Sequence, residues 1–537
     1  MKKIILASMI ASLPAMAMAQ STVDAYAISQ NEMRGTARFM SMGGAFTALG
    51  GDLSVLGQNP AGIGVYRSSE FGATLDINMR GYKTSTPQGT SKDNQTKAFC
   101  NNFGYVGSAL LDGALKSFNW GASYGRRASF DRIINGANMP TNTSMTNYIA
   151  GFSNGYSPET LGFASGYNPY QDSDADKFSI LAYNSYMINP LPGGENRYAG
   201  LFQDGTTADA MYTIRERGYV DEYNFDLGGN VNDVVYWGIG FGITDLSYWK
   251  DSYYSESLEN AYIPSVAGMA TGNAGFDLYN TQYISGSGWN FKAGVIVRPI
   301  PELRLGFAIH TPTWYKLTQR YQGTVDYYSY YNPNIAESDR NPITNGDKPE
   351  YTDEFVFDSR ITTPWRFMIG AATVIGNQAI VSVDYERVAF NDMRVKYNDG
   401  GYYGDFVNDN GVENNIKDCF QGSNIVRLGL EYRITPQFSV RAGYNIEATN
   451  VKNNATNGTT EILTGGTDPS YTLDKTTQYI SFGLGYRYQA FYVDAAYVYK
   501  NRKSTFHAYP DVNGYAAPTA DVTDSNSSIV ISAGFKF

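Results

Sequence analysis

The sequence predicts an all-β protein: a fourteen-stranded antiparallel transmembrane β-barrel with an N-terminal hatch plugging the lumen. Three observations carry this prediction, namely strict apolar–polar alternation, alternating short and long connections, and a glycine-rich segment before the first strand. The composition agrees, with 44 Tyr and 56 Gly among 537 residues. Tyrosine is favoured in strands and collects at membrane interfaces.

The alternation is clearest in residues 425–433. Val426, Leu428 and Leu430 fall on one face, and Arg427 and Glu431 fall on the other. A soluble sandwich would turn its polar face outward. Here the apolar faces often end in Tyr or Trp, as a membrane girdle requires, while the opposite faces mix glycine with single charges. We therefore expect lipid outside and a narrow, partly wet interior.

Fourteen segments have this period and a length that suits a barrel strand. They are about 71–80, 100–111, 117–130, 218–231, 233–249, 284–299, 302–318, 352–374, 378–396, 421–434, 437–449, 477–489, 491–503 and 526–537. Short links such as Asn232-Asp233 follow the even-numbered strands. Long polar loops, the longest at about 131–217, follow the odd-numbered ones. Residues 71–537 thus form the predicted barrel, with both of its ends on the periplasmic side.

The first residues are typical of a secretory signal peptide. Lys2 and Lys3 precede an apolar stretch, and Ala17-Met18-Ala19 forms a cleavage site, which predicts residues 1–19 as the signal peptide. No later stretch has 18 consecutive apolar residues, so no transmembrane helix is expected. The closing strand ends at Phe537 and resembles the signal that outer-membrane proteins present to the barrel-assembly machinery. These features predict a multi-pass barrel in the outer membrane.

The remaining composition argues against several functions. The net charge is −10 with no basic tract, which disfavours nucleic acid as a partner. Only two histidines are present, His310 and His507, so a His-rich metal or haem site is not expected, and no cofactor is predicted. Gly-x-Ser-x-Gly and His-Glu-x-x-His motifs are absent, so no catalytic residue and no enzyme is predicted. Cys100 and Cys419 are expected to be unpaired, although export permits a disulfide.

Residues Gly35–Gly64 are rich in small residues and poor in strand formers. By itself this segment fits either a flexible leader or a compact plug. The barrel pattern favours the plug, because a lumen of fourteen strands leaks unless something fills it. We therefore assign residues 20–70 to a hatch that enters from the periplasmic side and gates the lumen.

Two motifs in that segment resemble the outer-membrane family of the long-chain fatty acid transporter and the toluene-uptake channels (FadL/TodX-like). They are Arg38–Phe46, which reads RFMSMGGAF, and Asn59–Gly62, which reads NPAG. The resemblance implies passive uptake of hydrophobic molecules, which are held in an apolar pocket and released sideways through the wall. It also implies a role in the hatch or gate for Arg38, Gly43, Gly44, Asn59, Pro60 and Ala61. The loop at 131–217 matches no pattern of the family.

Inward-facing charges supply the candidate ligand-binding residues. Arg427 and Arg441 are the best candidates, with Lys292, Arg304 and Arg366 next. Charge inside a membrane-embedded lumen tends to be paired or functional. For any one residue an interior salt bridge is the favoured interpretation, and for Arg38 a bond to a wall carboxylate. The alternative is that one or two cations hold a ligand carboxylate.

The leading functional hypothesis is passive uptake of hydrophobic small molecules such as long-chain fatty acids or aromatic hydrocarbons. One alternative is an interaction or secretion-accessory barrel whose loops bind a partner. Another is haemin uptake. The expected partners are a hydrophobic ligand, outer-membrane lipid and, during biogenesis, the assembly machinery. The sequence does not predict an oligomeric state.

Overall fold

The computed structural model describes residues 21–266, 268–340, 346–352, 354–376, 378–398, 405–512 and 514–537. It is an all-β protein with a closed, antiparallel barrel of fourteen strands. The last wall strand pairs with the first, from Glu70 opposite Lys536 to Ser85 opposite Asp521, so the wall has no free edge. The wall strands are β1 (Glu70–Thr86), β2 (Gly89–Leu110), β3 (Leu115–Ser129), β7 (Thr207–Val231), β8 (Val235–Ser265), β9 (Gly268–Ile300), β10 (Leu303–His310), β14 (Arg366–Ile375), β15 (Ala379–Val388), β18 (Ser423–Arg433), β19 (Phe438–Glu447), β20 (Tyr471–Tyr488), β21 (Phe491–His507) and β22 (Thr519–Lys536). The predicted number of fourteen strands is confirmed, and each predicted segment overlaps one of these strands, although 302–318, 352–374 and 378–396 each also reach into a second, separate strand. The predicted signal peptide lies outside the described residues.

The exterior of the wall is apolar and the interior is polar. In β18, Leu428 and Leu430 are 44% and 51% exposed, whereas the intervening Arg427 and Glu431 are 7% and 6% exposed. The same alternation recurs in β20, where Phe482 is 57% exposed beside the buried Ser481. An exposed apolar band that runs around a closed barrel fits a hydrocarbon solvent. Among the described residues, no helix is long and apolar enough to cross a membrane.

The short links lie where the sequence predicts them, at one end of the barrel. Residues Asn232 and Asp233, which join β7 to β8, have φ values of 54° and 57°. Two successive residues with positive φ are typical of the type I′ turn, whose twist matches that of the paired strands. The Asn-Asp sequence therefore explains this connection locally.

The predicted long loops after the first and fifth strands are wrong. β1 and β2 continue past the predicted limits to a tight hairpin, with Ser85 opposite Thr90. β8 and β9 likewise remain paired until Ser265 lies opposite Gly268. The β1–β2 extension is largely polar on both faces, and the inner face of the β8–β9 extension mixes apolar residues such as Leu258 with polar ones such as Glu256. The alternation that marks a half-buried strand is therefore weak in both. Their backbone groups pair all the same, because the ladder extends beyond the apolar band.

Further elements build up the loop end of the barrel. Further strands there are the long β11 (Trp314–Tyr331) and the shorter β4 (Arg132–Thr141), β12 (Gly346–Tyr351), β13 (Phe355–Thr362), β16 (Arg394–Asn398) and β17 (Phe406–Asn408). β5 (Asn189–Pro190) and β6 (Tyr198–Ala199) form a small separate sheet. Helices there are α3 (Met145–Ser153), α4 (Pro158–Leu161), α5 (Pro169–Asp172), α6 (Lys177–Asn184), α7 (Asn410–Cys419) and α8 (Asn453–Thr456), with the single 3₁₀ turns η3 (Glu337–Asp339) and η4 (Phe390–Asp392).

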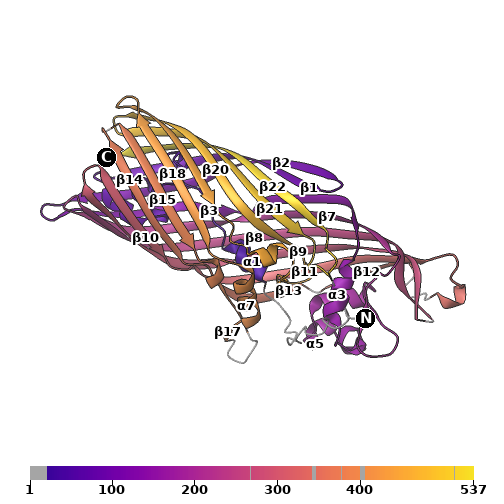
Figure 1. The fold of residues 1–537 in the computed structure, drawn as a ribbon. Coiled ribbons are helices and arrows are strands. Elements are labelled where there is room, and N and C mark those ends of the chain that lie inside the picture. Colours follow the sequence, from indigo (N-terminus) through magenta and orange to yellow (C-terminus); the bar gives the residue numbers. More distant parts are fainter. Residues whose placement is uncertain are drawn as a thin grey trace, which may run out of the picture.

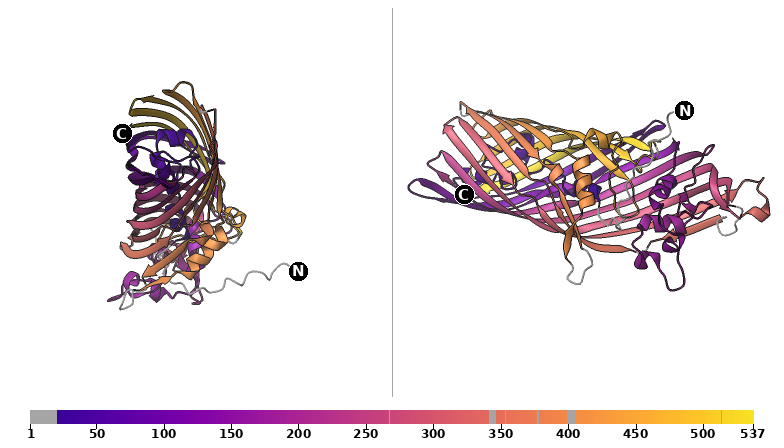
Figure 2. Two further views of the ribbon diagram at one scale, coloured as in Figure 1. Left: turned by 90° about the vertical axis from the view of Figure 1, so that its left-hand side faces the viewer. Right: turned by 60° about the horizontal axis from the view of Figure 1, so that its bottom comes forward.

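The longest predicted loop, at 131–217, is an ordered cap rather than an open loop. Its two ends belong to β4 and β7, and α3 to α6 occupy its middle. Ile149 of α3 and Phe178 of α6 join one apolar cluster with Tyr212 of β7 and Phe276 of β9. The helices lie at the end of the barrel opposite the C terminus, alongside the extended β7, β8 and β9 (Figures 1 and 2).

Both cysteines are free in the structure, Cys100 exposed and Cys419 buried. Burial raises the pKa of the Cys419 thiol to about 12, which keeps it in the unreactive thiol form at neutral pH. We expect a maleimide to label the folded protein once, at Cys100, and a second time only after unfolding. Intact-mass measurement reads the count directly, and a single label in the denatured, unreduced protein would instead mean that a thiol is blocked.

Candidate functional site

Residues 21–69 form a compact N-terminal segment seated against the inner face of the wall. It contains α1 (Thr22–Ile28), α2 (Ala37–Ser41) and two 3₁₀ turns, η1 (Leu53–Gly57) and η2 (Pro60–Val65). Most of its apolar side chains are buried in one cluster with wall residues Val106, Val498 and Val530. In Figure 1 α1 lies midway along the barrel near α7, and the rest of the indigo chain extends toward the end that holds the C terminus.

Inward-facing glycines of the wall form the seat. A methyl group on Gly429 would stand 2.7 Å from the carbonyl oxygen of Met42, and one on Gly43 would stand 2.8 Å from that of Leu428. Glycine inside a strand marks such a close approach of another backbone. The wall glycines this close to the segment are Gly121, Gly228, Gly238, Gly294, Gly306, Gly370, Gly429, Gly443 and Gly483. The glycines that alternate with charges therefore accommodate protein, where the sequence alone indicated a partly wet interior.

Polar contacts also fix the segment. The backbone N–H of Thr47 donates to Asp384 at 2.8 Å and that of Ala37 to Ser532 at 2.7 Å. Asn59 caps η2 by accepting from the N–H of Ala61, and its amide donates to the carbonyl of Thr47 at 2.6 Å. These bonds satisfy backbone groups that a segment without a ladder leaves open.

The six predicted hatch residues all lie in this packed segment. Gly43 and Gly44 have φ values of 63° and 74°, which a side chain rarely adopts. Arg38 pairs with Glu431 of β18 at 2.8 Å, which is the wall-carboxylate contact favoured for it. Pro60 opens η2, where its missing N–H costs no hydrogen bond, and Ala61 is fully buried.

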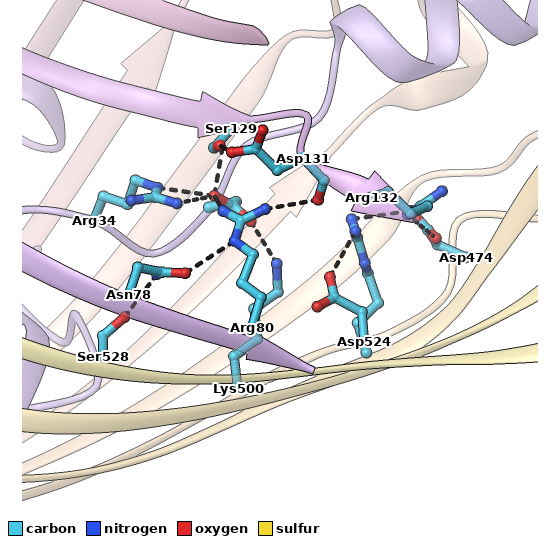
Figure 3. Close-up of polar contacts among 12 residues, drawn as sticks. Arg34, Asn78, Arg80, Ser129, Asp131, Arg132, Asp474, Lys500, Asp524 and Ser528 are labelled. Carbon is cyan, nitrogen blue, oxygen red and sulfur yellow. Dashed lines mark hydrogen bonds and ion pairs between the residues drawn. The ribbon is translucent and has the colours of Figure 1, made fainter. Parts of the chain in front are cut away.

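A charge network centred on Glu32 joins the segment to three wall strands (Figure 3). Its carboxylate accepts from Arg34 at 2.6 Å and from Lys500 of β21 at 2.5 Å. Arg80 of β1 lies 3.9 Å away, and the N–H of Ser129 donates at 3.3 Å. Because two of the cations belong to the wall, Glu32 ties the segment to it at several points.

A large cavity lies between this segment and the loop end, and we call it the upper cavity. Its empty volume is about 1210 Å³, part of it open to solvent. The apolar part of its lining includes Val23, Tyr26, Phe130, Ile214, Tyr248, Val388, Phe390, Ile425, Tyr471 and Tyr479. Tyr26 of α1 stacks on Phe420 beside α7 at 4.7 Å between ring centroids, so α1 and the loops border the same space.

Two further cavities adjoin it. The lower cavity, of about 790 Å³, borders Phe39 and Arg427, and the side cavity, of about 490 Å³, borders Lys292 and His310. Arg366 lines all three cavities. A side chain in that position can contact a molecule in any of them.

The five predicted ligand-binding cations differ in their partners. Arg441 is paired with both Glu431 and Asp494, at 2.7 and 2.6 Å. Arg304 donates to the carbonyl of Leu49 at 2.5 Å. Lys292 is 3% exposed and pairs with Glu222 at 2.8 Å.

Arg366 and Arg427 share one carboxylate, that of Glu386, at 2.5 and 2.6 Å. The Nη1 atom of Arg427 is buried and has no hydrogen-bond partner among the described residues. Since a buried donor normally finds an acceptor, Arg427 has capacity left for a ligand. The Nε atom of Arg304 is also without a partner among the described residues, but Arg304 lines none of the three cavities. For the alternative of haemin uptake, the relevant wall residue is His310. Its ring is hydrogen-bonded to the carbonyl of Gln58 at 2.7 Å.

Sequence reasoning missed the residues before the matched motifs. Tyr26 and Glu32 lie in residues 21–34, which carry no recognisable signature, and Glu447 lines both the upper and the lower cavity from the end of β19. The sequence offers one signal for such residues: the inward-facing side chains of β19 and β21 become polar toward one end of each strand.

Replacing Gly43 by alanine should destabilise the seat, because the new methyl group meets wall backbone on two strands, 2.8 Å from the oxygens of Leu428 and Tyr444. Backbone strain and crowding together predict a loss of about 2 to 4 kcal/mol. Gly51→Ala is the matched control, since Gly51 has a similar φ of 69° but its nearest neighbour stands at 3.6 Å. Urea unfolding in detergent should rank Gly43→Ala well below Gly51→Ala. Equal midpoints would mean that the segment is not seated as described.

The fold and the cavities define the class: a β-barrel whose lumen holds its own N-terminal chain beside internal cavities. No family model and no curated protein matches the sequence. Among solved structures, a FadL homologue from Pseudomonas aeruginosa is 12% identical, with 94% of this chain and 99% of that chain covered at a TM-score of 0.50. The toluene transporters TodX of P. putida and TbuX of Ralstonia pickettii are each 14% identical over the same shares, at TM-scores of 0.48 and 0.44. The chain thus has the fold of the FadL homologue.

Proposed function

We propose that this chain is an outer-membrane channel for passive uptake of hydrophobic small molecules, such as long-chain fatty acids or aromatic hydrocarbons. The observation that carries the proposal is the upper cavity, which lies inside a barrel with an apolar exterior and between its loops and its N-terminal segment. The cavity lining combines apolar and aromatic side chains with charged ones such as Lys250, Arg366 and Glu447. A concave site with apolar walls and convergent polar groups is typical of small-molecule binding. The likeness of the fold to that of the FadL homologue supports a channel of this class.

In this proposal residues 20–70 are the hatch. The segment blocks the lumen below the upper cavity, and its hold on the wall depends on glycine contacts and on the Glu32 network. Arg366 and Arg427 at the floor of the cavities supply cations for an acidic head group, while the aromatic lining holds an apolar tail. Passage requires only that the ligand exchange between cavities, so no energy source is needed.

The proposal places the loops outside the cell and the short turns in the periplasm. Residues 1–19 direct export as a signal peptide, and the assembly machinery recognises the closing strand that ends at Phe537. Residues 71–537 form the membrane barrel in contact with outer-membrane lipid. A barrel found in the inner membrane or in the periplasm after fractionation would contradict this placement.

Proteoliposomes test the uptake. Vesicles with the protein should take up labelled oleate or toluene faster than empty vesicles. Ala128→Trp, which fills the upper cavity from β3, should abolish the gain. Ala293→Trp is the matched control, because Ala293 lies on the outward face of β9, in line with the exposed Phe291 and next to the buried Lys292. Uptake that survives Ala128→Trp, or that is absent for every hydrophobic compound, would overturn the proposal.

One observation favours a second function, a barrel that binds a partner through its loops. The helices α3 to α6 and the long β7, β8 and β9 build an ordered cap beyond the apolar band. If the cap is a binding module, replacing residues 142–206 by a short linker should abolish capture of the partner and leave oleate uptake intact. If the cap only guides ligand, the same change should alter uptake alone.

A further inference from the structure

Four cationic side chains gather on the outer surface of the wall, at its loop end. Lys316 of β11 lies directly opposite Arg360 of β13, which in turn lies directly opposite Lys396 of β16. Arg394 lies two residues before Lys396 on the same face of β16. Directly opposite side chains have Cβ atoms about 4.5–5.5 Å apart. Together these four residues form what we call the basic row.

The basic row faces outward, away from the lumen. Each of its members alternates with buried residues of the same strand, namely Tyr315, Leu317, Ile361 and Val395. Lys316, Arg360 and Arg394 are exposed. The row is therefore separate from the cavities and from the cations that line them.

The row begins where the apolar band ends. Trp314, two residues before Lys316, lies 4.4 Å from Trp289 between ring centroids. On the side of these rings away from the loops, Phe307 and Ile309 of β10 are 50% and 39% exposed. Tryptophans collect at the boundary between hydrocarbon and head groups. The basic row begins two residues farther toward the loops than Trp314, at the depth of the lipid head groups.

Among the described residues, Lys316 and Arg394 have no anionic partner, and the acidic groups nearest to the row are engaged elsewhere. Asp358, two residues from Arg360, accepts a hydrogen bond from Thr318 at 2.8 Å. Farther along β11, Arg320 pairs with Glu354 at 3.8 Å. Among the described residues, Lys316 has no hydrogen bond or ion pair with the protein.

Two more members have donors left for an anion. Arg360 lies 4.0 Å over the ring of Phe406, a contact that uses the face of the guanidinium and not its N–H edge. Arg394 makes no hydrogen bond or ion pair among the described residues. Like charges that face each other across strands destabilise a sheet, and this chain has a net charge of −10. A cluster of cations in an acidic protein at head-group depth points to an anionic ligand there.

We propose that the basic row binds the phosphate groups of the glycolipid in the outer leaflet of the membrane. Arginine and lysine bind phosphate by charge-assisted hydrogen bonds, and the adjacent tryptophan pair lies against the acyl chains of the same lipid. Basic residues beside a membrane-spanning segment attract anionic lipid in this way. The inference rests on the membrane placement proposed above, with the loops outward, but not on the identity of the cargo.

The test compares two double variants of the purified full-length protein in neutral detergent. K316Q/R360Q removes two members of the basic row. K83Q/K92Q is the matched control, since Lys83 and Lys92 are also opposite each other on the extended β1–β2 hairpin. The probe is fluorescent lipopolysaccharide, intact or dephosphorylated. We expect K316Q/R360Q to weaken binding of the intact probe at least tenfold, K83Q/K92Q to leave it unchanged, and the dephosphorylated probe to bind weakly throughout.

Equal binding by the wild type and K316Q/R360Q would overturn the inference, as would equal binding of the two probes. If K83Q/K92Q weakens binding to the same extent, the lipid responds to positive charge in general and not to a specific site, which would also overturn the inference. The heat-induced mobility shift on electrophoresis checks that each variant is folded. Oleate uptake should be the same in all three proteins. If the wild type takes up oleate but does not bind the intact probe, this inference alone fails. If the wild type binds the probe but takes up no hydrophobic compound, the proposed function alone fails.

Discussion

Replacing Glu32 by glutamine should release the N-terminal segment from the wall. The carboxylate is the shared partner of Arg34 and Lys500, with Arg80 at 3.9 Å. Without this carboxylate, the buried cations lie close together and have lost the anion that they share. Breaking a buried pair by removing one partner costs about 3–5 kcal/mol. We expect amide hydrogens of residues 21–40 to exchange at least a hundredfold faster, and channels in planar bilayers to open more often.

Arg67→Gln is the matched control for this change. Arg67 also ties the segment to the wall, through Asp233 at 3.0 Å, but its side chain is 66% exposed. Solvent screens such a pair, so its removal should cost less than about 1 kcal/mol. Exchange in residues 21–40 that is unchanged in Glu32→Gln, or raised equally by Arg67→Gln, would mean that the charge network does not hold the segment.

The fold could be predicted from the sequence because its signal is local. Alternation along β18 identifies a strand without knowledge of its neighbours, and an Asn-Asp link identifies a turn. The strand extension near Ser85 was missed because both of its faces are largely polar. The one near Tyr253 was missed because its outer face is largely polar and its inner face mixes Tyr254 and Leu258 with Ser252 and Glu256. Only pairing with the next strand, as between Tyr253 and Tyr279, makes them strands.

The candidate site could be predicted only in part, for a related reason. Gly43 and Asn59 carry motifs that are visible in the chain, and they do lie in the packed segment. Partnerships between charges depend on residues far apart in sequence, such as Glu32 and Lys500. Nothing local distinguishes Arg441, which has two wall carboxylates, from Arg427, which keeps a donor without a partner.

The unpartnered donor of Arg427 predicts the second large effect. Arg427→Met should lower uptake of oleate about tenfold and leave uptake of toluene nearly unchanged. A charge-assisted hydrogen bond to a ligand carboxylate contributes about 1.5–3 kcal/mol, and 1.4 kcal/mol corresponds to a factor of ten. Toluene has no carboxylate and loses no such bond. Arg366 still neutralises Glu386 at 2.5 Å, so the wall should remain folded.

The control for a general effect of removing a wall arginine is Arg487→Met. Arg487 of β20 borders a small cavity with Arg38 and Asp52, apart from the three cavities that Arg366 lines. Its removal should leave the ratio of oleate to toluene uptake as in the wild type. If Arg427→Met lowers both compounds equally, the residue supports the wall and not the ligand. If it lowers neither, Nη1 of Arg427 faces no acidic cargo, and the cavities select their ligand by apolar contact alone.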